Sequence, residues 1–281
     1  MQLQGILAKV TCGASSSGLT GPGTTLFLQT FEANKDNAFG AVQRIGPDAA
    51  NAFQGNYYGS VPITGDSNGF TFFTRWGQPT GNTQNPTQFP ATGKLVTQLA
   101  IYLDPSDAAF TNEGQKLHYS VALNKAGTAP TFNRDYIFSF GWYSTTDASL
   151  SDVTGEALWV SVSHNTGDPK DPNRGPVPIT QAGWYYLQHV FYAKPCDTGA
   201  LSGQQCVYAD IKIFTASKGG ACGAVYTHSP TGRTASWMLG SDKEETISTV
   251  RSPRSGWLIH HQTTAAWQPL MSIDSFSYRT F

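Results

Sequence analysis

The ten residues from Gly183 to Tyr192, GWYYLQHVFY, constrain the fold more strongly than any other stretch of the chain. The run is rich in aromatic residues, which favour β-strands. Successive side chains of a strand point to opposite faces of its sheet. Two sets should therefore diverge: Trp184, Tyr186, Gln188 and Val190 on one face, and Tyr185, Leu187, His189 and Phe191 on the other. We expect one face in a hydrophobic core and a second face that offers rings and polar groups.

Similar strand-like runs follow one another from Lys94 to the C-terminus. They read KLVTQLAIYL, LHYSVALNK, RDYIFSFGWY, ALWVSVSHN, WYYLQHVFYA, VYADIKIFTA, TASWMLG and SGWLIHH, and they lead to PLMSIDSFSYRTF. The segments between them carry the Gly, Pro, Asn and Asp of turns and leave no room for crossover helices. Many strands with turn signals between them predict an all-β fold, an antiparallel β-sandwich or jelly roll.

The chain of 281 residues suits a single β-sandwich domain spanning residues 1–281, since sandwiches of this size often form one domain. Residues 94–281 form the regular strand core of this prediction. Residues 1–93 contribute N-terminal strands and loops with weaker patterning, including strands at 24–32 and 69–76 and one short helix near 48–53.

Charge and hydropathy exclude two classes of partner. The net charge is -1 and no basic block exists, so a nucleic-acid partner is not expected. No run approaches 18 apolar residues, so no membrane span is expected. We expect a monomer.

Four cysteines occur, and their spacing does not suggest a zinc site. Cys196 and Cys206 bracket a Gly-rich loop between two strand-like runs, which favours a disulfide that closes a hairpin. Cys12 and Cys222 would then form a second bridge. Disulfides predict a secreted, extracellular protein, and the alternative is a cytosolic protein with four buried thiols.

The order of several blocks resembles a group of bacterial exported proteins of the concanavalin A-like lectin/glucanase type. The blocks are TQLAIYLDP, LHYSVALNKAG, RDYIFSFGW, LWVSVSHN, AGWYYLQHVFY, SGWLIHH and MSIDSFSY, between Leu95 and Phe281. The resemblance implies a twisted two-sheet jelly roll with a concave face. In related members of that superfamily this face binds glycans and in some it cleaves them, so the resemblance implies a polysaccharide partner.

Acidic residues do not support a standard glucanase. A retaining glycosidase needs two carboxyl groups about 5 Å apart. Glu244 and Glu245 are adjacent and would diverge in a strand, while Asp210 and Asp274 stand alone in their runs. A glycoside hydrolase with an unrecognised acid pair therefore stays an alternative only.

A set of polar side chains in strand-like runs suits a polysaccharide lyase instead: Gln98, His118, Arg134, Tyr136 and His189. The set is similar in kind, though not in motif, to the Gln/Arg/His/Tyr clusters of jelly-roll lyases. Arg134 and Gln98 would neutralise the carboxyl group of a uronic acid. His118 or His189, with Tyr136 or Tyr186, would move the protons of a β-elimination. Read individually, these histidines are ordinary interior residues and Arg134 belongs to an ion pair or a loop cap.

Rings and amides could instead hold sugars without catalysis, as in a lectin or carbohydrate-binding module. The candidates are Trp142, Trp159, Trp184, Tyr186 and Gln188. The competing interpretation is that these rings fill the core between two sheets. A structural or surface-display protein is a third class. No cofactor is expected, and Asp168, Asp171 and Asn173 are a weak candidate set for a structural Ca²⁺.

Overall fold

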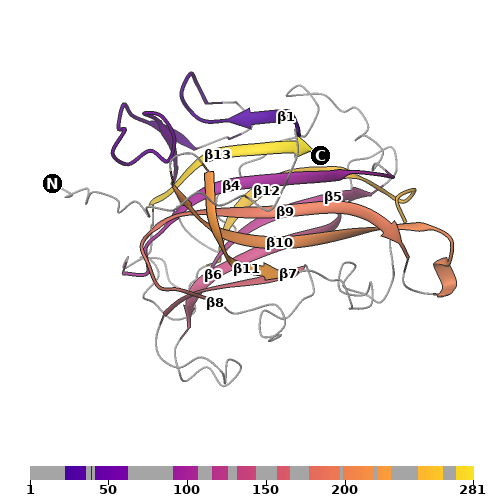
Figure 1. Cartoon of the computed structure of the whole chain (residues 1–281). Coiled ribbons are helices and arrows are strands. Elements are labelled where there is room, and N and C mark those ends of the chain that lie inside the picture. The colour runs from indigo at the N-terminus through magenta and orange to yellow at the C-terminus, as the bar shows by residue number, and fades with distance from the viewer. Residues whose placement is uncertain are drawn as a thin grey trace.

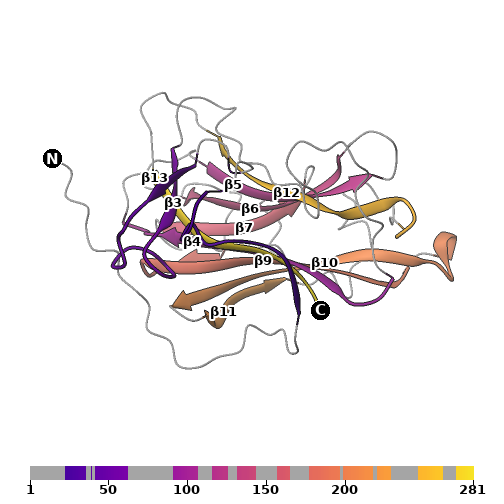
Figure 2. The same ribbon diagram turned by 90° about the horizontal axis from the view of Figure 1, so that it is seen from above.

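The computed structural model describes residues 23–35, 39, 42–62, 91–106, 116–125, 132–143, 157–164, 177–196, 199–217, 220–228, 246–261 and 270–281. Within these ranges two antiparallel sheets face each other as a β-sandwich (Figures 1 and 2). This confirms the predicted all-β class. The structure contradicts the short helix predicted near residues 48–53, where a turn closes with a 2.9 Å hydrogen bond from the Ala52 amide to the Asp48 carbonyl.

Sheet A contains the strands β11, β10, β9, β4, β13, β3 and β2 in this order, and β1 also pairs with β13. Their bounds are β1 Thr24–Gln29, β2 Gln43–Ile45, β3 Tyr58–Pro62, β4 Lys94–Leu103, β9 Gly183–Pro195, β10 Gln205–Ser217, β11 Gly220–His228 and β13 Leu270–Thr280. The sheet therefore joins the two ends of the described chain to its middle. β9 lies between β10 and β4, as the aromatic pattern of a well-buried strand requires.

Sheet B contains β12, β5, β6, β7 and β8 in this order. Their bounds are β5 Lys116–Lys125, β6 Phe132–Tyr143, β7 Ala157–His164, β8 Val177–Ile179 and β12 Val250–His261. The predicted strand at 69–76 and the predicted run TASWMLG lie outside the described residues.

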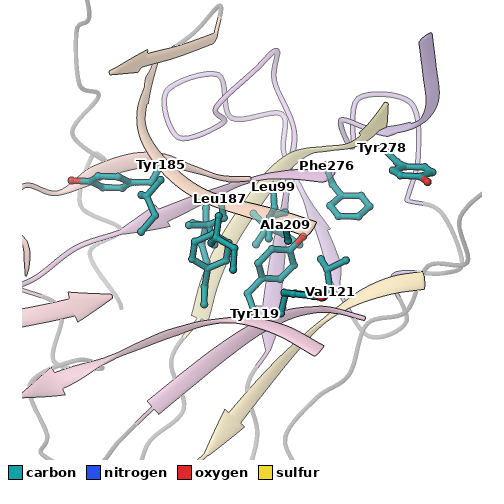
Figure 3. Close-up of a cluster of buried hydrophobic side chains, with 14 of the residues drawn as sticks. Leu99, Tyr119, Val121, Tyr185, Leu187, Ala209, Phe276 and Tyr278 are labelled. Carbon is teal, nitrogen blue, oxygen red and sulfur yellow. The ribbon is translucent and has the colours of Figure 1, made fainter. Parts of the chain in front are cut away.

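The main core fills the space between the sheets. The inward face of β9 contributes Tyr185, Leu187 and Phe191, and sheet B contributes Tyr119 and Val121 (Figure 3). The alternation predicted for β9 is therefore confirmed on this side.

A smaller apolar cluster covers the opposite, outer face of sheet A. Its members are Phe53, Ala100, Trp184, Tyr186, Phe214 and Ala216. Both faces of β9 are thus buried over most of its length.

One disulfide closes the turn between β9 and β10, where the chain also forms a short 3-10 turn at Gly199–Leu201. It joins Cys196 to Cys206, as the sequence predicted. The proposed partner bridge includes Cys12, which lies outside the described residues.

Candidate functional site

A row of polar side chains crosses the outer face of sheet A. Lys212 of β10 pairs with Gln188 of β9, Gln188 pairs with Gln98 of β4, and Gln98 pairs with Ser277 of β13. Neighbouring strands lie about 4.8 Å apart, so the members of this row are adjacent. We call these four residues the amide row.

The two amides at the centre of the row bind each other. Gln188 Nε2 donates a hydrogen bond to Gln98 Oε1 at 3.1 Å. Gln188 is 0% exposed, and its Oε1 has no hydrogen-bond partner among the described residues. An unpaired buried acceptor costs about 1–3 kcal/mol, so such a group calls for a ligand or a functional reason.

Two further unpaired polar atoms lie on the same face. The indole Nε1 of Trp184 and the guanidinium Nε of Arg279 are buried and lack a partner within the described part of the chain. Arg279 pairs with Val96, two residues along β4 from Gln98. A separation of two residues along a strand is about 7 Å, so Arg279 flanks the amide row.

Tyr186 stands beside the amide row, in the next row of the same face. That row joins Phe214, Tyr186, Ala100 and Asp274 across four strands. Tyr186 is 7% exposed. Burial raises the pKa of Tyr186 to about 12, a hydrogen bond with Gln98 opposes the rise, and the charge of Asp274 adds to it. The phenol is therefore protonated at neutral pH and can donate a proton.

Asp274 is the buried acid of this face, at 0% exposure. Its Oδ2 accepts a hydrogen bond from the Gln54 amide at 3.0 Å, and its Oδ1 accepts one from the Ser275 amide at 2.6 Å. Burial raises the pKa of Asp274 to about 7, although the main-chain amides lower it in part.

The segment 46–57 covers one part of the face. The ring of Phe53 packs against Tyr186 at 5.1 Å and against Trp184 at 5.6 Å between centroids. Trp184 is consequently only 1% exposed. The prediction that Trp184 and Tyr186 offer open stacking surfaces is therefore wrong in this structure, because Phe53 already covers their rings.

His189 and Tyr136 do not share the face of Gln98. His189 points into the core, where Nδ1 lies 3.2 Å from Thr97 Oγ1 and Nε2 lies 3.1 Å from the Tyr136 carbonyl oxygen. Tyr136 packs edge-on against Phe191 in the same core. The predicted grouping of these two residues with Gln98 is corrected, because β-strand alternation turns Gln188 outward and His189 inward.

The other predicted site residues belong to sheet B. His118 lies on β5, Arg134 and Trp142 lie on β6, and Trp159 lies on β7. Their side chains lie outside the description. Stacked sheets are about 10 Å apart, so sheet A itself separates these strands from the amide row on its far face. The strands of Arg134 and His118 thus belong to the other sheet, and the single pocket predicted for Arg134, His118 and Gln98 stays a prediction.

Sequence reasoning missed Lys212, Arg279 and the role of Asp274 on this face. Only the register of β10 and β13 against β9 and β4 brings them together. Within each run they fit an outward strand position, but a single run does not reveal which strand lies beside it.

No group of three or more metal-ligating side chains occurs among the described residues. Asp168, Asp171 and Asn173 lie outside them. Nor does any helix of the described ranges have the length and apolar character needed to cross a membrane.

Comparisons with known proteins find similarity only at the level of structure. No family model matches the chain, and no curated protein matches it by sequence. One solved structure that the chain matches is the alginate lyase Aly36B, a mutant in complex with an alginate trisaccharide. The identity is 11%, the match covers 86% of this chain and 94% of that chain, and the TM-score is 0.38. A second is the same lyase with an alginate tetrasaccharide, with 10% identity, 92% and 96% covered, and a TM-score of 0.39. The concanavalin A-like classification stays a prediction.

Proposed function

We propose that this protein is a carbohydrate-active enzyme that cleaves uronic-acid-containing polysaccharides by β-elimination on the outer face of sheet A. The observation that carries the proposal is the amide row with its unpaired Gln188 Oε1, next to Tyr186. Amides, two cations and a protonated phenol on one face can neutralise the carboxylate and protonate the leaving oxygen, and a general base for the C5 proton is the further group that this elimination requires.

Binding would use the carboxyl group of the sugar. Lys212 is the member of the row on β10, and Arg279 lies beside the row on β13. Both supply positive charge. The amide of Gln98 supplies a hydrogen-bond donor from a partly exposed side chain. Neutralising the carboxylate makes the proton on the adjacent C5 more acidic, which is the difficult part of the reaction.

The elimination breaks the C5–H and C4–O bonds and forms one C4–C5 double bond. A base removes the C5 proton, the C4–C5 double bond forms, and the C4–O bond to the neighbouring sugar breaks. The departing oxygen takes a proton, which Tyr186 donates in this proposal. Because its pKa is about 12, the phenol stays protonated at neutral pH until the C4–O bond breaks. We assign the base to none of the described side chains, because the buried Asp274 is already held by two main-chain amides.

The Cys196–Cys206 disulfide supports a secreted protein, since such bridges persist in oxidising compartments. A non-catalytic glycan-binding module is the alternative.

The test is ultraviolet absorbance during incubation with alginate, polygalacturonate and hyaluronan, with a neutral glucan as the control substrate. We expect a rise from the conjugated unsaturated uronate with at least one acidic polymer and none with the glucan. The variant Tyr186→Phe keeps the ring and removes the hydroxyl, and should lower the rate by about 10²–10⁴-fold. No rise with any acidic polymer would overturn the lyase. Retardation of the protein in a gel containing the polymer would then favour the binding module.

A further inference from the structure

A reciprocal clamp fixes the segment 46–57 to the edge of the outer face. Asp274 accepts the Gln54 amide through Oδ2, and Ser275 Oγ donates to Gln54 Oε1 at 2.9 Å. Ser275 has a φ of 45°, in the left-handed region that residues other than glycine rarely adopt. Strain of this kind persists only where the surroundings fix the backbone, and it concentrates at functional sites.

A second anchor holds the other end of the same segment. Glu32 Oε1 accepts hydrogen bonds from the main-chain amides of Asn56 and Tyr57, both at 2.8 Å. The guanidinium of Arg44 stacks on the Tyr57 ring at 3.4 Å from its centroid. Carboxylates on both sides therefore leave the segment little freedom to move over the sheet.

This anchoring fixes the position of Phe53, the residue before Gln54. Its ring meets Tyr186 edge-on, with 79° between the planes. Within sheet A, Tyr186 lies between Ala100 of β4 and Phe214 of β10. Among the described residues, Phe53 is the ring from outside the sheet that packs edge-on against Tyr186.

We infer that Phe53, held by the Asp274–Ser275–Gln54 clamp, is a positioning residue that sets the orientation of the Tyr186 hydroxyl toward the amide row. The kinetic consequence of this inference, a change in kcat, rests on the proposed function. Its structural consequence, the fixed orientation of Tyr186, rests on geometry alone. A misplacement of about 1 Å at a reacting group can cost about 10²-fold in rate. Backbone strain such as that at Ser275 concentrates where a functional group must be held in place, and the group that the clamp orients through Phe53 is Tyr186.

The experiment compares two variants in which leucine replaces a buried phenylalanine, so that both should lower Tm to a similar extent. Phe53→Leu removes the ring that contacts Tyr186, and Phe39→Leu removes a buried ring that packs against Phe31 and Phe276 instead. Each variant is measured for its Tm, for kcat and KM on the acidic polymer that the wild type cleaves, and for the ¹³Cζ signal of labelled Tyr186. Tyr186→Phe identifies that signal by its disappearance.

We expect both variants to lower Tm, and only Phe53→Leu to shift the Tyr186 signal and to lower kcat by about tenfold to a hundredfold at unchanged KM. Equal effects of the two variants on the Tyr186 signal, or no effect of Phe53→Leu, would overturn the inference. If Phe53→Leu does not fold, Gln54→Ala loosens the clamp at an exposed side chain and should shift the same signal. If the wild type cleaves no uronate polymer, the proposed function fails while the Tyr186 signal still decides the role of Phe53.

Discussion

Gln188 and His189 are consecutive on β9, yet they meet opposite environments. Gln188 joins the amide row, while His189 lies in the core against Phe138 at 4.9 Å between ring centroids. Burial lowers the pKa of His189 to about 3, although the hydrogen bond to the Tyr136 carbonyl opposes the shift. This histidine is neutral at physiological pH and serves the fold.

Two buried residues make opposite contributions to stability as pH changes. His189 has an ordinary pKa of 6.5 and a folded pKa of about 3, so its contribution is full above pH 6.5 and is lost as pH falls toward 3. Asp274 has an ordinary pKa of 3.8 and a folded pKa of about 7, so its contribution is full below pH 3.8 and is lost as pH rises through 7. Between pH 3.8 and 6.5 the two trends oppose each other.

We predict that Asp274→Asn uncovers the trend of His189. The Tm of this variant should fall on acidification from pH 6.5 to 3.8 more steeply than that of the wild type. Thermal denaturation at a series of pH values measures both slopes. His189→Gln is the matched variant and should show the reverse change of slope. Parallel curves for the wild type and both variants would contradict the assignment of these two groups.

At the scale of elements, alternating aromatic and β-branched residues predict strands such as β9 and β10, but the pattern does not predict a strand that is rich in glycine and alanine. β9 and β10 follow directly from their alternating aromatic and β-branched residues, and the loop between them carries the predicted disulfide. β11, with the sequence GACGAVYTH, is not among the runs that the sequence pattern predicts as strands, since glycine and alanine have low strand propensity. Pairing with β10, which includes two register shifts, outweighs that propensity.

The disulfide should contribute measurably to the stability of the β9–β10 hairpin. It closes a loop with a sequence separation of 10, for which the loss of unfolded-state entropy contributes about 2–4 kcal/mol. We predict that the double variant Cys196→Ser, Cys206→Ser lowers the free energy of unfolding by about this amount. Urea denaturation of both proteins under identical redox conditions measures the difference. An unchanged urea midpoint would show that the bridge does not constrain the unfolded chain.

At the scale of the whole molecule, the sandwich distributes the predicted site residues over two sheets. Gln98, Gln188 and Tyr186 were recognised from single strands, and the structure brings them together. The prediction groups Arg134 and His118 with Gln98 because all three lie in strand-like runs of the central region, but β5 and β6 belong to sheet B. Lys212 reaches the face through the β9–β10 hairpin, and Arg279 reaches it through the pairing of β13 with β4, which is far away in the chain. Such non-local register is not encoded in any one run.

The central claim is that function resides on the outer face of sheet A and that the inner face serves the fold. Thr97 and Gln98 are adjacent on β4 and test it as a pair, since Thr97 contacts His189 in the core and Gln98 bonds Gln188 outside. The measurement is the initial rate of unsaturated-uronate formation, with Tm determined for each protein.

We predict that Gln98→Leu abolishes most of the rate per folded molecule. It should also lower Tm, because the buried Nε2 of Gln188 loses its acceptor. Thr97→Val should lower Tm and keep the rate per folded molecule, because it leaves an inward nitrogen of His189 unpaired. The opposite result, with turnover lost in Thr97→Val and retained in Gln98→Leu, would place the chemistry on the inner side and contradict the account.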